Sequence, residues 1–582
     1  MKNVVLAAMI VGLWIGPWDC GKAAQRSEAD RTKAASRAAQ KKETRMKAEA
    51  EAFLEKYQRQ FAALELKSNL AWWAAANSGK KEDFDAQAAA QLALKKFHSD
   101  PAAYRQIQRL LKSKDQFEPL EARALEVAEL AYKGNQLPEE MLSQMVKLST
   151  EIEQVFKTFR GELEGKRLSN NDLLEMLGDE NDSPKRKAIW ETLMQPGGAV
   201  GAKLVELAKL RNRAAAKLGY ANYWEMEIKL QEHDPDRLLK IFAELQRLTD
   251  GPFKEMKEKL DRELSARFKV QPQQIMPWHY DNPFFQAAPP SAKVDLDEFY
   301  EKKRKDDIVA IAEKFYDDIG LPIRQIVARS DLYEREGKDQ HAFSISIDRA
   351  DDVRTLLNVK PTEEWMDTML HEEGHAVYDL HVDRSLPYNL REPAHAFTTE
   401  GVAMLFGALG KNPTWMIGYA GADAKRVGGL EEAIYEQRRR EQLIFARWTL
   451  VMLHFEKALY ENPDQDLNKL WWDYKGRFQL LHRAADRDQP DWAAKPHFTI
   501  APVYYHNYML GELFAAQVRH VLADLAGHQG PTSKLSFNGR KEFGTLLKQR
   551  VFRPGKRWPW PQFVQEVTGE ELTPKYFAAE VR

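Results

Sequence analysis

HEEGH, residues His371–His375, stands inside the run EEWMDTMLHEEGHAVY that extends from Glu363 to Tyr378. Two glutamates open this run and apolar residues follow the motif, a pattern typical of an α-helix. Residues four apart lie on the same face of a helix, so the imidazoles of His371 and His375 can reach one metal ion. The H-E-x-x-H pattern therefore predicts a helical zinc site with these two histidines as ligands.

The other residues that such a site needs are also present. Catalytic zinc takes three protein ligands and a water, and it lowers the pKa of that water to about 7. Glu372, beside the first ligand, is placed to take the proton as general base. Glu400 opens the apolar run EGVAMLF and is the preferred third ligand, with His395 and Glu392 as weaker alternatives. A helix with two unrelated histidines is the competing interpretation.

Composition restricts the class of protein. The chain has 582 residues, of which 43% are hydrophobic, with 86 basic and 87 acidic residues and a net charge of −1. This balance argues against nucleic acid as the main partner, because phosphate binding needs a basic excess. Cys20 is the only cysteine, which excludes an intrachain disulfide and a zinc site made of cysteines. Any metal must therefore bind to histidines and carboxylates.

The N-terminus has the pattern of an export signal. Lys2 precedes an apolar run from Val4 to Ile15, too short for a membrane-spanning helix, which needs about 20 residues. We therefore predict a signal peptide over 1–20 and an exported protein, periplasmic or secreted. Cys20 just after the run suggests a lipoprotein signal, and a lipid anchor there is the only membrane contact expected. Residues 21–48 form a charged tether or a solvated helix.

The rest of the chain, 49–582, shows mainly helical periodicity and is expected to form one metallopeptidase domain. A single clear strand is expected over 342–347, and Gln195–Gly198 is expected to break a helix because it contains proline and two glycines. Apolar residues recur at spacings of three and four in Leu66–Ala76, Leu120–Lys133, Met141–Leu163, Arg237–Phe268 and Leu430–Tyr460. The fold class is mainly α.

Five further short segments of the chain are informative when they are taken together with the HEEGH motif. They are Leu386-Pro387, Leu390-Arg391-Glu392, Trp471-Trp472, Lys495-Pro496-His497 and Tyr505–Tyr508. Together with HEEGH they resemble the angiotensin-converting-enzyme-like (peptidyl-dipeptidase A) zinc peptidases, with features of the neighbouring thimet-oligopeptidase-like family. The resemblance implies a two-lobed helical peptidase with a deep central cleft lined by a small β-sheet. It also implies one Zn²⁺ per chain, held by His371, His375 and Glu400.

The resemblance assigns a second set of residues to catalysis. His497 and Tyr508 match the residues that stabilise the tetrahedral oxyanion, next to Glu372 as the base. An imidazole and a phenol are suitable donors toward a developing negative charge. Ordinary aromatic packing is the alternative for the tyrosines, because Tyr504, Tyr505 and Tyr508 form a stripe at helical spacing.

Four more residues are assigned to substrate binding by the same resemblance. Lys495 and Tyr505, with Gln286, match the groups that hold the free C-terminal carboxylate of a peptide. An ammonium beside a phenol can form charge-assisted hydrogen bonds with a carboxylate. His341 matches the histidine of the strand that lines the substrate cleft.

The chain also departs from this family at two positions. Asn507 stands where the animal enzymes have an arginine that helps to bind chloride, which argues against chloride activation. Met404 stands where the family often has an aspartate four residues after the third ligand. Asp379, one turn after His375, is the suggested substitute for that second support of the metal.

The predicted function is zinc-dependent hydrolysis of short peptides with a free C-terminus, releasing C-terminal dipeptides. An endo-acting oligopeptidase is the first alternative. A non-catalytic receptor for zinc or peptides on the same fold is the second, and a helical scaffold with a coincidental motif is the third.

Overall fold

The computed structural model describes residues 20–291 and 294–582. The predicted signal peptide lies outside these residues except for Cys20, where the first helix begins. Most of the described chain is helical, with two small antiparallel sheets, so the mainly α fold class is confirmed. Among the described residues, no helix combines the length and the apolar character that crossing a membrane requires.

Four of the five predicted helical segments lie within a helix, whereas the one predicted over Met141–Leu163 ends at Thr158 and its last residues, Gly161–Leu163, form a strand. The first half contains α1 (Cys20–Ser78), α2 (Lys81–His98), α3 (Pro101–Leu111), α4 (Pro119–Gly134), α5 (Glu139–Thr158), α6 (Asn170–Asp179), α7 (Ser183–Lys217), α8 (Tyr223–Leu230) and α9 (Pro235–Phe268). The second half contains α10 (Lys305–Asp318), α11 (Arg324–Val327), α12 (Glu363–His381), α13 (Ala396–Gly407), α14 (Pro413–Trp415), α15 (Ala424–Glu461), α16 (Leu467–Gln479), α17 (His497–Ile500), α18 (His506–Leu525), α19 (Lys541–Leu546), α20 (Trp560–Thr568) and α21 (Lys575–Glu580).

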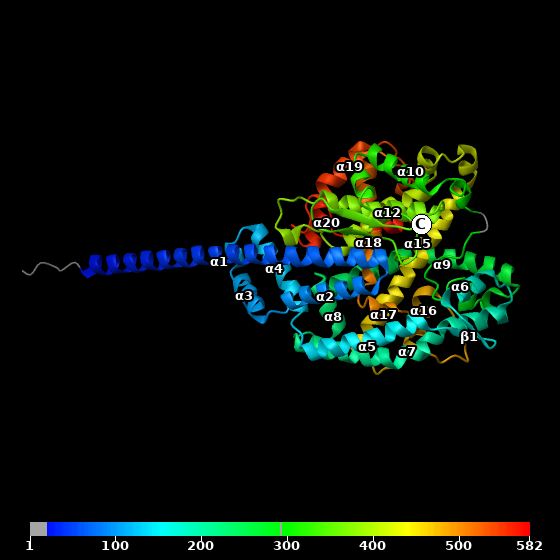
Figure 1. The fold of residues 1–582 in the computed structure, drawn as a ribbon, viewed down its shortest axis with the longest axis horizontal. Helices are drawn as coiled ribbons and strands as arrows, with labels where there is room; N and C mark the ends of the chain where they lie inside the picture. Colours follow the sequence, from blue (N-terminus) through cyan, green and yellow to red (C-terminus); the bar gives the residue numbers. More distant parts are fainter. Residues whose placement is uncertain (1–19, 292–293) are drawn as a thin grey trace, which may run out of the picture.

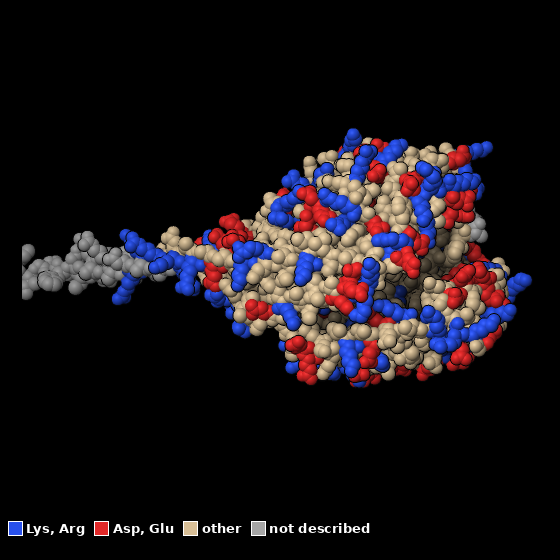
Figure 2. All heavy atoms as spheres, in the orientation of Figure 1, with Lys and Arg blue, Asp and Glu red and all other residues tan. Residues whose placement is uncertain are grey.

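The body has two parts with a hollow between them. In Figure 1, α5, α6, α7 and α16 lie in the lower part, while α10, α12, α19 and α20 lie in the upper part. Helix α15 runs from one part toward the other. The surface view in Figure 2 is hollowed between the two parts at the right of the picture. This is the two-lobed arrangement that the resemblance implies.

Helix α1 joins the N-terminal segment to the body. It is 59 residues long, and its first part projects away from the body in Figure 1. Residues 21–48, for which a tether or a solvated helix was predicted, fall within it. Its last turns contact the site region, because Asn69 Nδ2 donates to the carbonyls of Ser346 and Ile347 at 3.2 Å each. The division into 1–20, 21–48 and 49–582 stays a prediction.

The small sheets are hairpins. Strand β1 (Gly161–Leu163) pairs with β2 (Lys166–Leu168), and β3 (Phe343–Ser346) pairs with β4 (Val353–Leu356). In the second hairpin, Phe343 lies opposite Leu356 and Ser346 opposite Val353. Strand β3 is the predicted strand, and its residues line the cavity at the candidate site.

The helix break predicted at Gln195–Gly198 is wrong. Helix α7 continues through it, with Pro196 in its interior. Gly197 serves packing instead, because a Cβ there would lie 2.3 Å from the carbonyl oxygen of Pro490, whereas a Cβ on Gly198 would meet nothing within 4 Å. A proline inside a helix removes one backbone hydrogen bond, and α7 nevertheless continues past it in close contact with the 490–494 segment.

Three glycines bring the site helices together. A Cβ on Gly374 of α12 would lie 3.0 Å from the Cα of Ala403 on α13. A Cβ on Gly401 of α13 would lie 2.7 Å from the carbonyl oxygen of Gly511 on α18. Because the helix backbones meet without side chains between them, residues on α12, α13 and α18 approach one another closely.

Candidate active site

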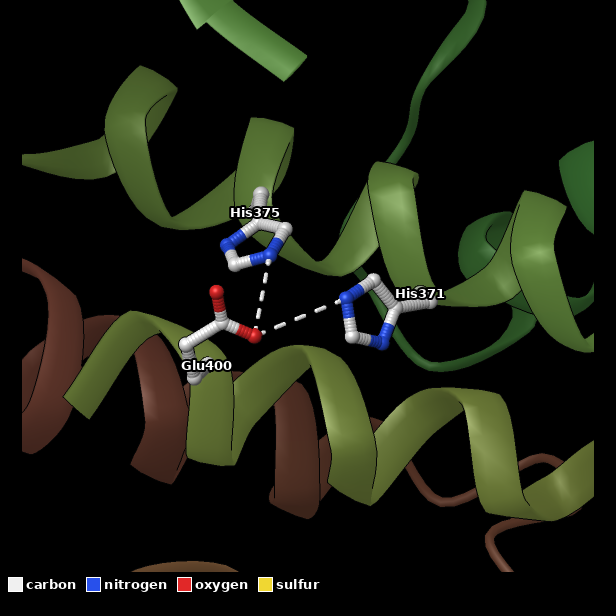
Figure 3. Close-up of side chains that lie close together, drawn as sticks. All are labelled: His371, His375 and Glu400. Carbon is white, nitrogen blue, oxygen red and sulfur yellow. Dashed lines mark ion pairs between the residues drawn. The ribbon is translucent and has the colours of Figure 1, made fainter. Parts of the chain in front are cut away.

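Two helices place three metal-binding side chains together. His371 and His375 lie one turn apart on α12, and Glu400 points toward them from α13 (Figure 3). The Oε2 atom of Glu400 is 3.8 Å from Nε2 of His371 and 3.9 Å from Nε2 of His375. The three ligand atoms all lie within 4.8 Å of one another. We call these three residues the candidate metal centre.

The donor set and spacing fit zinc. Two atoms that each bind one zinc ion at about 2.0–2.2 Å cannot be more than about 4.4 Å apart, and both nitrogen–oxygen distances satisfy this limit. Burial lowers the pKa of both His371 and His375, so the imidazoles are neutral, as metal binding requires. Burial raises the pKa of Glu400 to about 7, so its carboxylate needs a nearby cation.

The two alternative ligands are committed elsewhere. His395 accepts a hydrogen bond from the Phe397 backbone at 3.2 Å with Nδ1, and its Nε2 contacts the Gln231 carbonyl at 2.7 Å. Glu392 forms ion pairs with Arg349 and Lys556. Both ring nitrogens of His395 and the carboxylate of Glu392 therefore have partners, which favours Glu400 as the third ligand.

The support of the metal ligands differs from the suggested one. Nδ1 of His375 contacts the hydroxyl of Thr399 at 2.6 Å, which leaves Nε2 facing Glu400. Burial lowers the pKa of His371, and the negative charge of Asp367 opposes this effect. Among the described residues, Asp379 has no hydrogen bond to either histidine. Such outer contacts fix the orientation of ligating imidazoles.

Glu372 is buried beside the centre, with 8% of its surface exposed. Burial raises its pKa to about 8, the charge of Glu400 adds to this effect, and a hydrogen bond with the Ser344 backbone opposes it. A carboxyl group with a pKa near neutrality is suited to taking and giving a proton. The environment therefore supports the role of general base.

A second group of side chains lies at another cavity. The Nζ atom of Lys495 donates to Oε1 of Gln286 at 2.6 Å and lies 5.4 Å from the ring centre of Tyr505. Burial alone lowers the pKa of Lys495 to about 7. Gln286 and Lys495 line a cavity of about 350 Å³. We call Gln286, Lys495 and Tyr505 the lysine cluster.

Aromatic contacts join Tyr505 of the lysine cluster to His497 and Tyr508. The ring of Tyr505 is 5.0 Å from that of His497 and 5.3 Å from that of Tyr508. Burial raises the pKa of Tyr508, and the charge of Glu400 adds to this effect. Nδ1 of His497 is buried and has no partner among the described residues. Both predicted oxyanion donors therefore pack against Tyr505 of the lysine cluster.

His341 lies apart from the other predicted residues. It is exposed just before β3, and its backbone N–H donates to Asp339 at 2.9 Å. The residues that line the cavity at the metal centre begin with Ala342 on this strand and do not include His341.

The side chain of Asn507 is buried and contacts two other polar side chains. Its amide nitrogen donates to Gln231 at 2.8 Å, and its oxygen lies 3.3 Å from a ring nitrogen of His233. Both of its polar ends therefore have protein partners.

Sequence reasoning missed two residues that touch the site. Thr399 is adjacent to Glu400, and Ser344 lies in the predicted strand, but neither has a motif of its own. Each contact depends on how a second element packs on α12, a feature that no spacing along the chain reveals.

An H-E-x-x-H helix that meets a glutamate from a second helix is the arrangement on which helical metallopeptidases are built. Residues 44–576 match the family model described as Peptidase M2, angiotensin-converting enzyme. The chain belongs to this family, which confirms the resemblance found in the sequence.

Individual relatives are distant. Angiotensin-converting enzyme of Bos taurus is 26% identical over 205 residues, a stretch that covers 34% of this chain and 16% of that protein. Carboxypeptidase 1 of Bacillus subtilis is 24% identical over 261 residues, covering 40% of this chain and 50% of the relative. Thermostable carboxypeptidase 1 of Pyrococcus furiosus is 22% identical over 404 residues, covering 65% and 72%.

Proposed function

We propose that this chain is a zinc-dependent peptidase that acts on short peptides with a free C-terminus and releases C-terminal dipeptides. The observation that carries this proposal is the lysine cluster. A buried lysine shares a hydrogen bond with Gln286 and lies beside Tyr505, whose ring is 5.3 Å from that of Tyr508. Receptors for a terminal carboxylate are built from such charged and neutral donors.

The roles of the protein groups follow from their places. Glu372 takes a proton at its carboxylate from the water whose oxygen bonds to the scissile carbonyl carbon, and it passes this proton to the leaving amine as the C–N bond breaks. His497 and Tyr508 donate hydrogen bonds to the oxygen that becomes negative. Lys495, Tyr505 and Gln286 bind the terminal carboxylate and thereby orient the peptide.

His371, His375 and Glu400 would hold the zinc ion. When bound, zinc supplies a Lewis acid that polarises the carbonyl and makes water more acidic. A base beside the metal centre, together with the proposed oxyanion donors, favours catalysis over a purely binding role, because a receptor needs neither.

Three measurements test this function together. The zinc content of the purified chain is determined, and hydrolysis of a short peptide is followed with and without a chelator. A free and a C-terminally amidated form of the same peptide are then compared. We expect about one zinc per chain, loss of activity with the chelator, and a strong preference for the free peptide. Equal hydrolysis of both forms would instead favour an endo-acting oligopeptidase.

We also propose that the protein is exported, because Lys2 and the apolar run up to Ile15 have the pattern of a signal peptide. Mass spectrometry of the mature N-terminus tests this proposal. A chain that still begins at Met1 in the cytoplasmic fraction would contradict it, and a lipid mass on Cys20 would establish the anchor.

A further inference from the structure

The cavity at the metal centre is separate from the cavity that Gln286 and Lys495 line. It has a volume of about 600 Å³, and its lining contains the metal centre, Glu372 and strand β3. No residue lines both this cavity and the cavity of Gln286 and Lys495. A peptide with its C-terminus on Lys495 and its scissile bond at the centre therefore has its amino-terminal part in the larger cavity.

Most charged groups in the wall of this larger cavity are already paired. Both oxygens of the Glu65 carboxylate accept hydrogen bonds from Arg349 at 2.6 Å. Glu392 pairs with Arg349 and with Lys556. Arg391 donates to the carbonyl of Leu386 at 2.8 Å. The basic residues of this wall thus already have partners.

Asp379 is the exception among these groups. It lies one turn after His375 on α12, lines the cavity, and is half-buried. Among the described residues, its carboxylate has neither a hydrogen bond nor an ion pair. Burial and the charge of Glu392 raise its pKa to about 7, whereas Arg349 lowers it. A half-buried carboxylate without a partner is unfavourable, and a cation brought in by a ligand would relieve this cost.

We propose that Asp379 determines substrate specificity by binding a cationic group on the peptide residues that precede the scissile bond. The inference rests on the proposed function, because it takes the direction of the peptide from Lys495. Two sources can supply the cation: the α-amino group of a short peptide, or the side chain of lysine or arginine in a longer one. Both present N–H donors with a positive charge to a carboxylate.

The experiment compares matched peptides that all end in the same dipeptide, Ala-Leu. N-acetylated tetrapeptides have two residues before that dipeptide. Each of these two positions is tested in turn with lysine and with norleucine, which has a similar length without the charge. An unacetylated norleucine tripeptide supplies the α-amino group alone. We expect wild-type kcat/KM to favour the peptides with a cation by about 10- to 100-fold, the size of one charge-assisted hydrogen bond. The arm with the larger gain identifies the source.

Asp379→Asn should remove this preference and leave kcat/KM for the acetylated norleucine peptides within about threefold of wild type. Glu364→Gln, on the same helix but exposed and outside this cavity, is the matched control and should keep the preference. A wild-type enzyme that cleaves all the peptides equally would overturn the inference without any variant. A preference that survives in Asp379→Asn would also overturn it. If no peptide shows zinc-dependent hydrolysis, the proposed function fails too. If the peptides are hydrolysed without a preference for a cation, only the inference about Asp379 fails.

Discussion

The metal centre comes from the neighbouring helices α12 and α13, with His371 and Glu400 only 29 positions apart, whereas the lysine cluster joins Gln286 to Lys495 across 209 positions. The centre needs one helical spacing and one contact between neighbouring helices. The cluster needs a loop to be held against α16, where Lys475 and Gln479 donate to the carbonyls of Phe284 and Phe285. In the proposed function, chemistry therefore rests on local geometry, whereas substrate choice rests on long-range packing. Substitutions in the two regions should have separable effects.

Glu372→Gln gives the largest expected effect and concerns the chemistry alone. The amide cannot take a proton, while all three metal-binding side chains remain, so zinc should stay at about one per chain. Activity should fall by at least the 10²–10⁴-fold that is usual for one acid–base group. The measurement is kcat/KM together with zinc content of the same sample. Substantial hydrolysis by a zinc-loaded variant would contradict the role of Glu372.

Glu400→Ala breaks the same region in a different way. Two imidazoles alone make an incomplete site, so the variant should lose zinc on dialysis and lose activity with it. Glu392→Gln is the control, because Glu392 lies in the same cavity but is paired with Arg349 and Lys556. Metal analysis of both variants decides the matter. If zinc stays near one per chain in Glu400→Ala, the third ligand is another residue.

The sequence predicted the local region better than the long-range one. His371, His375 and Glu372 follow from one helical motif, and Glu400 from the apolar run that it opens. The contacts of Thr399 with His375 and of Ser344 with Glu372 depend on close packing of other elements on α12 and have no signal in spacing.

Gly197 led to the wrong prediction of a helix break, because a glycine that permits close packing cannot be distinguished along the chain from one that ends a helix. His341 carried a signal from the resemblance alone, and in the structure it lies outside the cavity lining.

Lys495→Ala should affect substrate choice and leave the metal in place. A charge-assisted hydrogen bond contributes roughly 1.5–3 kcal/mol, or about 10- to 150-fold in affinity. KM should rise by this factor for peptides with a free C-terminus and hardly change for amidated ones. The test compares kcat/KM for matched free and amidated peptides on the wild type and the variant. An equal loss for both substrates would make Lys495 structural and favour the endo-acting oligopeptidase.

A change of pH should produce the smallest and most selective effect on the lysine cluster. Burial lowers the pKa of Lys495 to about 7, so the ammonium is present below this pH and is lost as the pH rises through it. At pH 8 only about one lysine in ten keeps its charge in the free enzyme, so KM for free peptides should rise about tenfold between pH 6 and pH 8.

Groups at the metal centre titrate over the same range, but they affect free and amidated peptides alike. The ratio of kcat/KM for the two peptides therefore isolates Lys495: it should be high at pH 6 and fall toward pH 8. In Lys495→Arg, whose guanidinium stays charged, the ratio should not vary with pH. A ratio that is flat in the wild type, or that rises with pH, would show that the charge of Lys495 does not hold the substrate carboxylate.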